Sequence, residues 1–540
     1  MEKIVQTKSC KKCLSDFSIT DKDLEFYKKI SPKFNGEVCE IPSPTFCPEC
    51  REQRRLSFRN KNNLYRRKCD FSWENIISIY SSDKNIKVYS SETYWSDKWD
   101  SLDYWKEIDF EKSFFEQFWE LQKEVPHQAI NNKLVENCDY VNECVWCKDC
   151  YLLFDSVSSE NSLYSYILRD WENCVDTWYC DKCFNCYEIL ECGWNSRNLF
   201  YSFKTSKSTN SYFLHSCFKC EDCIWCVNLS NKKYYIFNEK FTEENYKIKK
   251  EELFKKWLNF IKEEYEKLVK KSPKNYMIWY ANEDVFWDNI FFSKNCFECY
   301  DSNHLENCKY IYTWMEIKDS YDIYMFWKNL TLSYDSIVIW ENSSKILFSN
   351  SCINSNNIFY SKDLIWCSNC FLSIWLRNKK YCILNKQYTK EEYEKKVSDI
   401  IKIMIKNWEW WEFFSENISP FSKNNYKSPE LKVEKIISAN KLPEKISDIP
   451  NDILNWAIKC EVSWKPFRII KQELDFYRKH NLPIPKKHPD IRHLERMKLR
   501  NPRKLFDRKC DKCSCEIKST YIEDREEIIY CENCYDKEVY

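Results

Sequence analysis

The sequence predicts a mainly β protein with helical segments, in which zinc ribbons at both ends flank a duplicated β-solenoid-like repeat. Three observations support this fold class. They are paired C-x-x-C motifs near each end, a repeat of about 12 residues between them, and a second copy of that repeat 147 residues further on. The chain has 540 residues, enough for two to four domains. Apolar residues make up 43% of it, so it can bury several cores.

The first element is an N-terminal zinc ribbon, predicted over residues 1–65. Its proposed zinc ligands are Cys10, Cys13, Cys47 and Cys50. Each C-x-x-C pair turns two thiolates toward one point, and four thiolates satisfy tetrahedral zinc without an open position. A closed site of this kind is structural rather than catalytic. A helix or loop such as 21–30 must fill the long gap between the pairs, and Cys39 is an alternative ligand.

Residues 66–105 are predicted to form a degenerate ribbon. The segment Arg67–Asp70 matches Arg508–Asp511 at an offset of 441, and that offset places Ser72, Ser90 and Thr93 on three C-terminal cysteines. With one ligand left, this ribbon should bind no metal and should be held by packing of Trp95, Trp99 and Tyr104. Residues 106–137 are then expected to form a helical linker.

The central repeat predicts a β-solenoid, because a 12-residue unit is too short for a helical hairpin. Asn or Asp recurs at the expected turns, where these residues tolerate a left-handed backbone. Two units per coil are expected. The turn positions are Asp149, Asn161, Asn173, Asn185, Asn198, Asn210 and Asp222.

The repeat is duplicated. Asn231–Asn238 returns as Asn378–Asn385, and each copy ends in a charged helical stretch, 242–271 and 389–406. The first unit is therefore expected over 138–272 and the second over 285–406. Thr-Glu-Glu and Thr-Lys-Glu-Glu at the helix starts suit an N-cap followed by acids.

Cysteine runs such as Cys217, Cys220, Cys223 and Cys226 allow three interpretations. They can be small apolar residues inside a narrow coil, further zinc ligands, or part of an iron–sulfur site. An iron–sulfur run should end in x3 and Cys-Pro, which is missing here. In the second copy, position 217 becomes Leu364 and position 226 becomes Ser373, which favours core cysteines.

The last 134 residues are expected to contain a helical basic segment, 407–504, and a C-terminal zinc ribbon, 505–540. The ribbon has the tetrathiolate spacing, with 17 residues between its two C-x-x-C pairs and Cys515 as a possible competing ligand. The predicted zinc ligands are Cys510, Cys513, Cys531 and Cys534.

The charge of the chain is unevenly distributed, although its net value is only +1. Residues 51–68 carry eight bases and one acid, and 465–509 carry fifteen bases and five acids. Both stretches adjoin a ribbon and contain aromatic residues, which is typical of a phosphate-contacting surface. A solvated basic face that balances an acidic remainder is the alternative.

Other classes have weaker support. No apolar run is long enough to cross a membrane, and residues 1–13 lack a signal-peptide core. The 32 cysteines then indicate a reducing compartment, so we expect a cytoplasmic protein without a membrane partner. No phosphate loop, metalloprotease motif or nucleophile elbow is present, and we expect no enzyme.

Glycine occurs twice and tryptophan 23 times, although typical usage would give roughly 38 glycines. Several tryptophans lie where turns require a left-handed backbone, which glycine adopts readily. We hypothesise that many are encoded by UGA and are glycine in the native host. Trp171, Trp225, Trp340 and Trp375 are examples. By contrast, Trp95, Trp99, Trp410 and Trp456 are interpreted as true tryptophans.

Three segments, Phe46–Arg51 with Gln53–Leu56, Tyr94–Asp100 and Lys465–Pro483, resemble an uncharacterised zinc-ribbon family of uncultivated, small-genome bacteria. The resemblance runs nearly end to end. It implies glycine at Trp73, Trp105, Trp408, Trp411 and Trp464, and cysteine at Ser72, Ser90 and Thr93. It implies an architecture but no activity.

The sequence therefore predicts a zinc-binding scaffold that binds RNA, DNA or a ribonucleoprotein through its two basic stretches. A protein-binding scaffold is one alternative, because solenoids present extended surfaces. An iron–sulfur redox protein built on 217–226 is the other.

Overall fold

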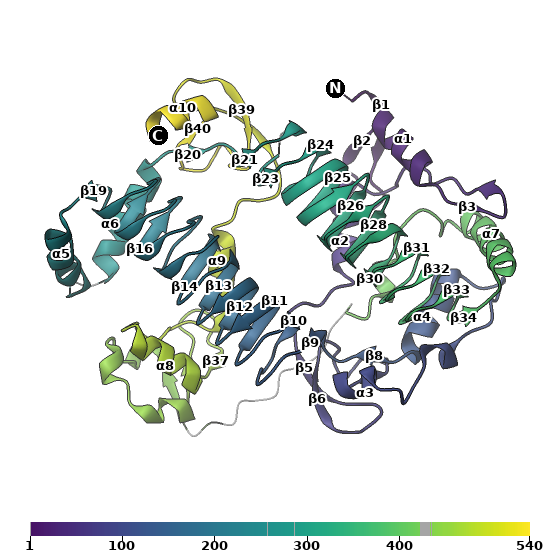
Figure 1. Ribbon diagram of the computed structural model, residues 1–540, viewed down its shortest axis with the longest axis horizontal. Coiled ribbons are helices and arrows are strands. Elements are labelled where there is room, and N and C mark those ends of the chain that lie inside the picture. The colour runs from purple at the N-terminus through teal and green to yellow at the C-terminus, as the bar shows by residue number, and fades with distance from the viewer. Residues whose placement is uncertain (1, 256–257, 286, 422–432, 434, 540) are drawn as a thin grey trace. The chain divides into compact units, whose positions relative to one another are not determined.

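The computed structural model describes residues 2–255, 258–285, 287–421, 433 and 435–539 (Figure 1). It is mostly β, with a β-solenoid of about 20 turns in its middle part. The chain forms two compact units, as far as the described residues extend. The first comprises Met1–Ala129 and Met277–Tyr426, and the second comprises Ile130–Tyr276 and Lys427–Tyr540. The N-terminal ribbons thus belong to the same unit as the second solenoid copy, and the C-terminal ribbon belongs to the same unit as the first copy.

A single 12-residue repeat closes one coil of the solenoid. Strands pair in parallel with their equivalents 12 residues later, as Tyr151 does with Leu163 and Leu163 with Val175. The expectation of two repeats per coil was therefore wrong. The reason lies in the backbone, which turns at every third residue with φ near +50°, as at Leu152, Asp155 and Ser158. Four such corners return the chain to its starting side after 12 residues.

The side chain that follows each corner points into the coil, so every third residue is interior. These positions hold Cys, Ser, Leu, Ile and a few other residues, and they form one buried core in each solenoid. Interior serines accept hydrogen bonds from the next coil, as Ser208 Oγ does from Cys220 N at 3.0 Å. Because the coil is narrow, small side chains are favoured there.

Asparagine and aspartate at the corners behave as predicted. All seven turn positions of the first copy have φ between +49° and +55°. Amides on successive coils also bond each other, as Asn198 Nδ2 does to Asn210 Oδ1 at 2.8 Å. The single 13-residue step contains two adjacent corners, Trp194 and Asn195.

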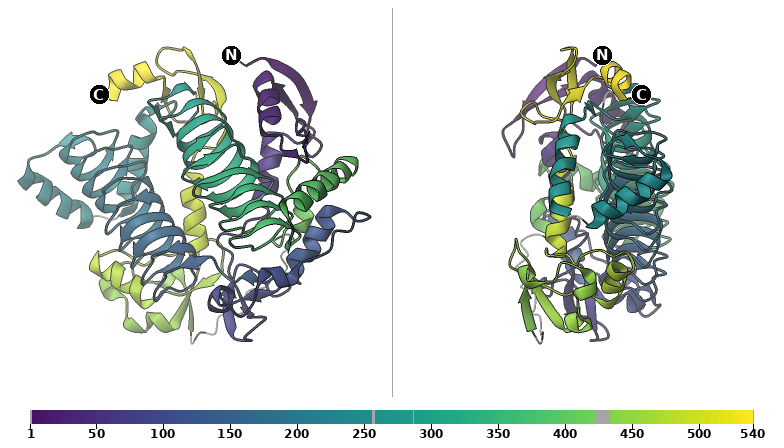
Figure 2. Two further views of the ribbon diagram at one scale, coloured as in Figure 1. Left: turned by 45° about the vertical axis from the view of Figure 1, so that its right-hand side comes forward. Right: turned by 90° about the vertical axis from the view of Figure 1, so that its left-hand side faces the viewer.

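The solenoid of the second unit is an 11-stranded sheet (Figure 2). Its strands are β9 (Asn132–Lys133), β10 (Asn142–Val145), β11 (Tyr151–Glu160), β12 (Leu163–Glu172), β13 (Val175–Asp181), β14 (Tyr187–Cys192), β15 (Arg197–Phe200), β16 (Thr209–His215), β17 (Glu221–Val227), β18 (Lys233–Ile236) and β19 (Glu239–Lys240).

The solenoid of the first unit has 14 strands. They are β21 (Trp279–Tyr280), β22 (Glu283–Val285), β23 (Ile290–Phe291), β24 (Lys294–Phe297), β25 (Tyr300–Lys318), β26 (Tyr321–Trp327), β27 (Leu330–Thr331), β28 (Tyr334–Trp340), β29 (Ser343–Leu347), β30 (Asn350–Ile353), β31 (Asn356–Phe359), β32 (Ser368–Phe371), β33 (Lys380–Ile383) and β34 (Lys386–Gln387).

Ribbon hairpins and helices complete the first unit. They are β1 (Ile4–Ser9), β2 (Asp16–Thr20), α1 (Asp21–Ile30), β3 (Lys33–Phe34), β4 (Glu37–Val38), α2 (Pro48–Leu56), β5 (Tyr65–Lys68), β6 (Asn75–Ser78), β7 (Val88–Tyr89), α3 (Ser91–Trp95), α4 (Phe114–Glu124), β8 (His127–Gln128) and α7 (Lys390–Lys406). Thr20 and Thr389 close capping boxes that start α1 and α7.

The second unit is completed by α5 (Glu243–Lys255), α6 (Leu258–Lys271), β20 (Lys274–Asn275), β35 (Lys435–Ser438), β36 (Trp456–Lys459), β37 (Pro466–Phe467), α8 (Lys471–Lys479), α9 (Pro489–Lys498), β38 (Phe506–Lys509), β39 (Glu516–Ser519), β40 (Ile529–Tyr530) and α10 (Glu532–Val539). Residues 256–257 of the predicted helix over 242–271 lie outside the described residues. So do 422–432 and 434 of the segment predicted to be helical, 407–504. The described part of that segment includes the three-stranded sheet β35–β36–β37 as well as helices.

Candidate metal centres and basic surfaces

The four predicted N-terminal ligands meet at one point. One ligand atom from each of Cys10, Cys13, Cys47 and Cys50 lies within 4.8 Å of the others, and the Cys13 and Cys47 Sγ atoms are 3.6 Å apart. Four thiols in this arrangement can hold one metal ion tetrahedrally. Cys39 lies outside the cluster and packs in the apolar core.

Local geometry explains why these thiols converge. Cys10 opens a tight turn after β1, in which Leu14 has φ +64° and its N–H bonds the Cys10 carbonyl. Cys47 is the N-cap residue of α2. Burial raises the pKa of Cys10, but backbone N–H groups of Cys13, Cys47 and Lys12 outweigh it and lower the pKa to about 6. Cys10 is therefore ready to act as a thiolate ligand, whereas burial raises the pKa of Cys47 and Cys50, which would release their protons when a metal binds.

Five thiols converge in the C-terminal ribbon. Cys510, Cys513, Cys515 and Cys531 lie within 4.8 Å of one another, and Cys513 Sγ is 3.4 Å from Cys515 Sγ and 3.7 Å from Cys531 Sγ. The predicted fourth ligand, Cys534, also interacts with Cys513. Since a tetrahedral metal ion takes four ligands, Cys515 and Cys534 are alternatives for the last position.

In the degenerate ribbon of the first unit, the β5–β6 hairpin and α3 surround a single thiol, that of Cys69. Cys69 is fully buried, and its Sγ accepts hydrogen bonds from the N–H groups of Ser72 at 3.4 Å and Ser90 at 3.3 Å. The hydroxyls of Ser90 and Thr93 bond each other at 3.1 Å. Tyr94 and Trp99 pack against this point, while Trp95 is largely exposed.

The solenoid cysteines bond to backbone carbonyls of their own coil and of the next one. Cys220 Sγ lies 3.6 Å from the Phe218 carbonyl and 3.4 Å from that of Leu229, and the same pattern recurs at Cys217 and Cys223. Within the described residues, the groups of three or more metal-ligating atoms are the two ribbon clusters. The thiols lie in the buried cores of the two solenoids.

The first basic stretch is largely internal, which the sequence analysis did not foresee. Arg51 contacts Asp322 at 2.8 Å, and Arg54 and Arg55 contact Asp335 at 2.8 and 2.6 Å. All five side chains are at most 4% exposed. These arginines dock α2 on the solenoid and cannot reach phosphate.

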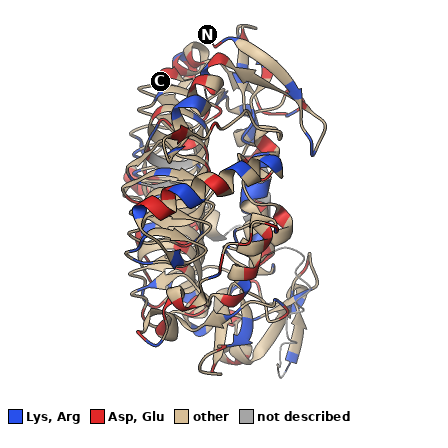
Figure 3. Ribbon diagram, turned by 90° about the vertical axis from the view of Figure 1, so that its right-hand side faces the viewer, with Lys and Arg blue, Asp and Glu red and all other residues tan. Residues whose placement is uncertain are grey.

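The second basic stretch also contains arginines in buried ion pairs, and it has exposed cations as well. Arg492 and Arg496 on α9 both pair with the buried Asp176. Three acids of the stretch are exposed, namely Asp475, Asp490 and Asp507. Its exposed cations are Lys465, Arg468, Lys471, Arg478, Lys479, Lys498, Lys504 and Lys509. Over the elements in view in Figure 3, basic and acidic residues are interspersed.

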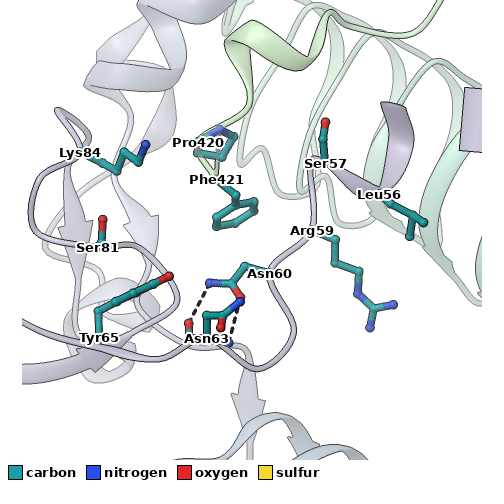
Figure 4. Close-up of a pocket in the computed structure, with 10 residues that line it drawn as sticks. All are labelled: Leu56, Ser57, Arg59, Asn60, Asn63, Tyr65, Ser81, Lys84, Pro420 and Phe421. Carbon is teal, nitrogen blue, oxygen red and sulfur yellow. Dashed lines mark hydrogen bonds between the residues drawn. The ribbon is translucent and has the colours of Figure 1, made fainter. Parts of the chain in front are cut away.

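A cavity of about 260 Å³ lies beside the first basic stretch. In Figure 4, Lys84 points toward Phe421, while the Arg59 side chain points away from it. Arg59 stacks over Tyr324 of the solenoid, with 6.0 Å between guanidinium and ring centre. Buried Asn60 shapes the wall by donating to the carbonyls of Asn63 and Ile79 at 2.8 and 2.6 Å.

No family model matches the chain, and no curated protein matches its sequence. In the described part of the chain, every helix is too short or too polar to cross a membrane. The functional interpretation therefore comes from the two cysteine clusters, the solenoids and the exposed charges.

Proposed function

We propose that the protein is a zinc-stabilised scaffold that binds nucleic acid through exposed cations beside its ribbons. The observation that carries the scaffold role is the closed nature of both metal centres. Thiols occupy every ligand position of a tetrahedral ion, so the metal can stabilise a ribbon but has no open position for a substrate. The identity of the metal as zinc is part of the proposal and is supported by the all-thiol ligand set, which suits zinc and also iron.

The nucleic-acid part is supported by the second basic stretch. Eight of its cations are exposed against three exposed acids, a surface excess of five positive charges. Lys465, Arg468 and Lys471 lie at β37 and the start of α8, and all three are exposed. Phosphate contacts of this kind give affinity without base readout.

The cavity of the first unit supplies a different contact. Phe421, Tyr65 and Lys84 line the cavity, and one face of Phe421 is stacked on Tyr80 with ring centres 5.1 Å apart. Aromatic faces beside cations are typical of proteins that hold unpaired nucleotides. Single-stranded RNA or DNA is therefore the preferred partner, ahead of a duplex.

The test is a titration of a fluorescent single-stranded oligonucleotide at several salt concentrations. The logarithm of the association constant should fall linearly with the logarithm of the salt concentration, with a slope of about −0.7 for each phosphate contacted. The variant Lys465→Glu, Arg468→Glu, Lys471→Glu should weaken binding at least tenfold and flatten the slope. A matched control, Lys390→Glu, Lys395→Glu, Lys406→Glu on α7, changes the charge equally at other exposed sites.

Binding that is absent in low salt, or that responds equally to both variants, would overturn the nucleic-acid part. The scaffold part would then remain, with a protein as its partner.

A further inference from the structure

Residues 456–498 repeat the N-terminal ribbon apart from its β3–β4 hairpin. The order β1, β2, α1, α2 returns as β36, β37, α8, α9. Phe26-Tyr27 on α1 corresponds to Phe476-Tyr477 on α8 at an offset of 450, the same offset that relates Cys10 to Cys460. From Cys47 onward, the offset is 441, because the connection between the two helices is nine residues shorter.

The turn after Cys460 has the backbone of the metal-binding turn after Cys10. Trp464 has φ +61° and donates its N–H to the Cys460 carbonyl at 3.2 Å. Leu14 has φ +64° and donates to the Cys10 carbonyl at 3.0 Å. Cys460 N donates to the carbonyl five residues later at 3.0 Å, as Cys10 N does at 2.9 Å. Both thiols are almost fully buried.

The helix that carries the second pair of ligands is also repeated. Cys47 and Pro48 begin α2, and His488 and Pro489 begin α9 at the equivalent positions. His488 is the N-cap residue of α9, as Cys47 is of α2. One turn later, Ile491 stands at the position of Cys50.

Docking on the solenoid is the same in both copies. Arg51 pairs with Asp322, and Arg492 pairs with Asp176. These aspartates are equivalent in the two solenoids, at an offset of 146. The offset becomes 147 further along, because the second copy contains one more doubled corner than the first.

Aromatic contacts repeat as well. Tyr27 meets Tyr334 edge-on with ring centres 5.5 Å apart, and Tyr477 meets Tyr187 edge-on at 5.7 Å. The likeness thus covers the turn, both helices and their contacts.

We infer that residues 456–498 are a metal ribbon with a latent site, in which Cys460 keeps its place and Ser463, His488 and Ile491 replace three thiolate ligands. Cys460 Sγ accepts the Ser463 N–H at 3.4 Å, and in the metal-binding turn Cys10 Sγ accepts the Lys12 N–H at the same distance. The His488 N–H interacts with the Cys460 thiol, as the Cys47 N–H does with that of Cys10, so the start of the second helix lies at the buried thiol in both copies. Restoring thiols there should create a site for a tetrahedral, thiolate-binding divalent ion, zinc or cobalt(II).

The experiment restores the ligands in the full-length chain, with Ser463→Cys, His488→Cys and Ile491→Cys together. Cobalt(II) is titrated into the metal-free parent protein and, separately, into the metal-free triple variant. The thiolate-to-cobalt absorption is recorded in both titrations. We expect one more bound ion per chain than in the parent, with a proportionate gain in absorbance. A second variant, Ser463→Cys with Ile491→Cys, keeps His488 and should bind the extra ion through three thiolates and one imidazole.

The control introduces three cysteines at exposed, scattered positions, Ser82→Cys, Lys240→Cys and Lys395→Cys. It should leave the stoichiometry unchanged. If both restored variants fold, as judged by circular dichroism, yet bind no additional ion, the inference is wrong. It is equally wrong if the control gains as much cobalt absorption as the restored site. Neither outcome depends on nucleic-acid binding.

Discussion

The Arg51 guanidinium holds one carboxylate oxygen of Asp322 at two points, with Nε at 3.0 Å and Nη2 at 2.8 Å. Both side chains are at most 2% exposed. A buried charge that loses its partner is strongly destabilising, because it is neither solvated nor neutralised. Docking of α2 therefore depends on this pair as a unit.

The first prediction concerns that pair. Arg51→Met should lower the free energy of unfolding by about 3–5 kcal/mol, since Asp322 then stays buried with less compensation. Urea unfolding measures the change. Lys28→Met on α1 is the control, because Lys28 is exposed and its loss should cost under ~0.5 kcal/mol. Equal losses in the two variants would contradict the docking role.

The second prediction is a pH dependence set by Asp335. Burial raises the pKa of this carboxyl, but Arg54 and Arg55 outweigh it and hold the pKa below its ordinary value. The stabilisation is then complete above about pH 4, the pKa in the unfolded chain, and is lost as pH falls toward the lower folded value. Asp335→Asn should be less stable at pH 7 and should flatten the acid limb of a stability–pH curve. An unchanged acid limb would argue against it.

The third prediction separates metal-dependent ribbons from metal-free ones. Chelation should expose residues 4–60 and 505–539 to protease, because thiolate ribbons lose their folding energy with the metal. Residues 65–95 and 456–498 should stay protected, since buried packing of Tyr94 beside Cys69 and of Tyr477 in the cluster with Cys460 holds them without an ion. Mass spectrometry of the first fragments reads the pattern. Uniform cleavage of all four segments would disprove the distinction.

The fourth prediction addresses the competing thiols. Cys515→Ser and Cys534→Ser should each keep one C-terminal metal ion, because the other thiol completes the set. The double variant should lose it. The measurement is the metal content per chain. Cys513→Ser, which removes a ligand common to both sets, is the comparison. Loss of metal in one single variant alone would identify the true fourth ligand.

The fifth prediction concerns tryptophan, where we propose that several residues are glycine in the native host. Of the four examples named from the sequence, Trp225 and Trp375 have a left-handed backbone, with φ +52° and +58°, whereas Trp171 and Trp340 do not. Trp73, Trp408, Trp411 and Trp464 lie outside the solenoids and have φ between +60° and +76°. Trp464→Gly should therefore stabilise the protein by about 1 kcal/mol, because the left-handed backbone strains any residue with a Cβ.

Trp410→Gly is the matched control for this prediction. Trp410 is fully buried, and its Nε1 bonds the Glu40 carbonyl at 2.9 Å. Its loss should cost at least 3 kcal/mol. If Trp464→Gly destabilises as well, the recoding proposal fails. Sequencing the codon gives an independent answer, since UGG at Trp464 would also exclude it.

The ribbons and the solenoid were predictable because their signals are local. C-x-x-C spacing places two thiols in one turn, and Asn161 or Asn173 marks a corner by its own preference for a left-handed backbone. The coil size was missed because Leu152 and Ser158 also form corners, although neither residue type favours that backbone. Nothing in the sequence alone distinguishes them from strand residues.

The docking arginines could not be assigned from sequence. Arg51 and Asp322 are 271 residues apart, and nothing near α2 showed that its charge would be neutralised. The repeat of the N-terminal ribbon at 456–498 was hidden for a related reason. Three of its four ligands are replaced and its connection is shorter, so the sequence match at Phe476-Tyr477 is short and becomes clear through the backbone turns and the contacts of Tyr477 and Arg492.

The 12-residue coil also has a consequence for how such a gene can change. Because one repeat is one full coil, gain or loss of a single repeat by recombination leaves every later residue on the same side of the solenoid. Each event would lengthen or shorten the stack by one strand spacing, about 4.8 Å. A one-residue insertion can be absorbed as a doubled corner, as at Trp194 and Asn195. The solenoid can therefore change its length by whole coils during evolution while the residues of its core stay the same.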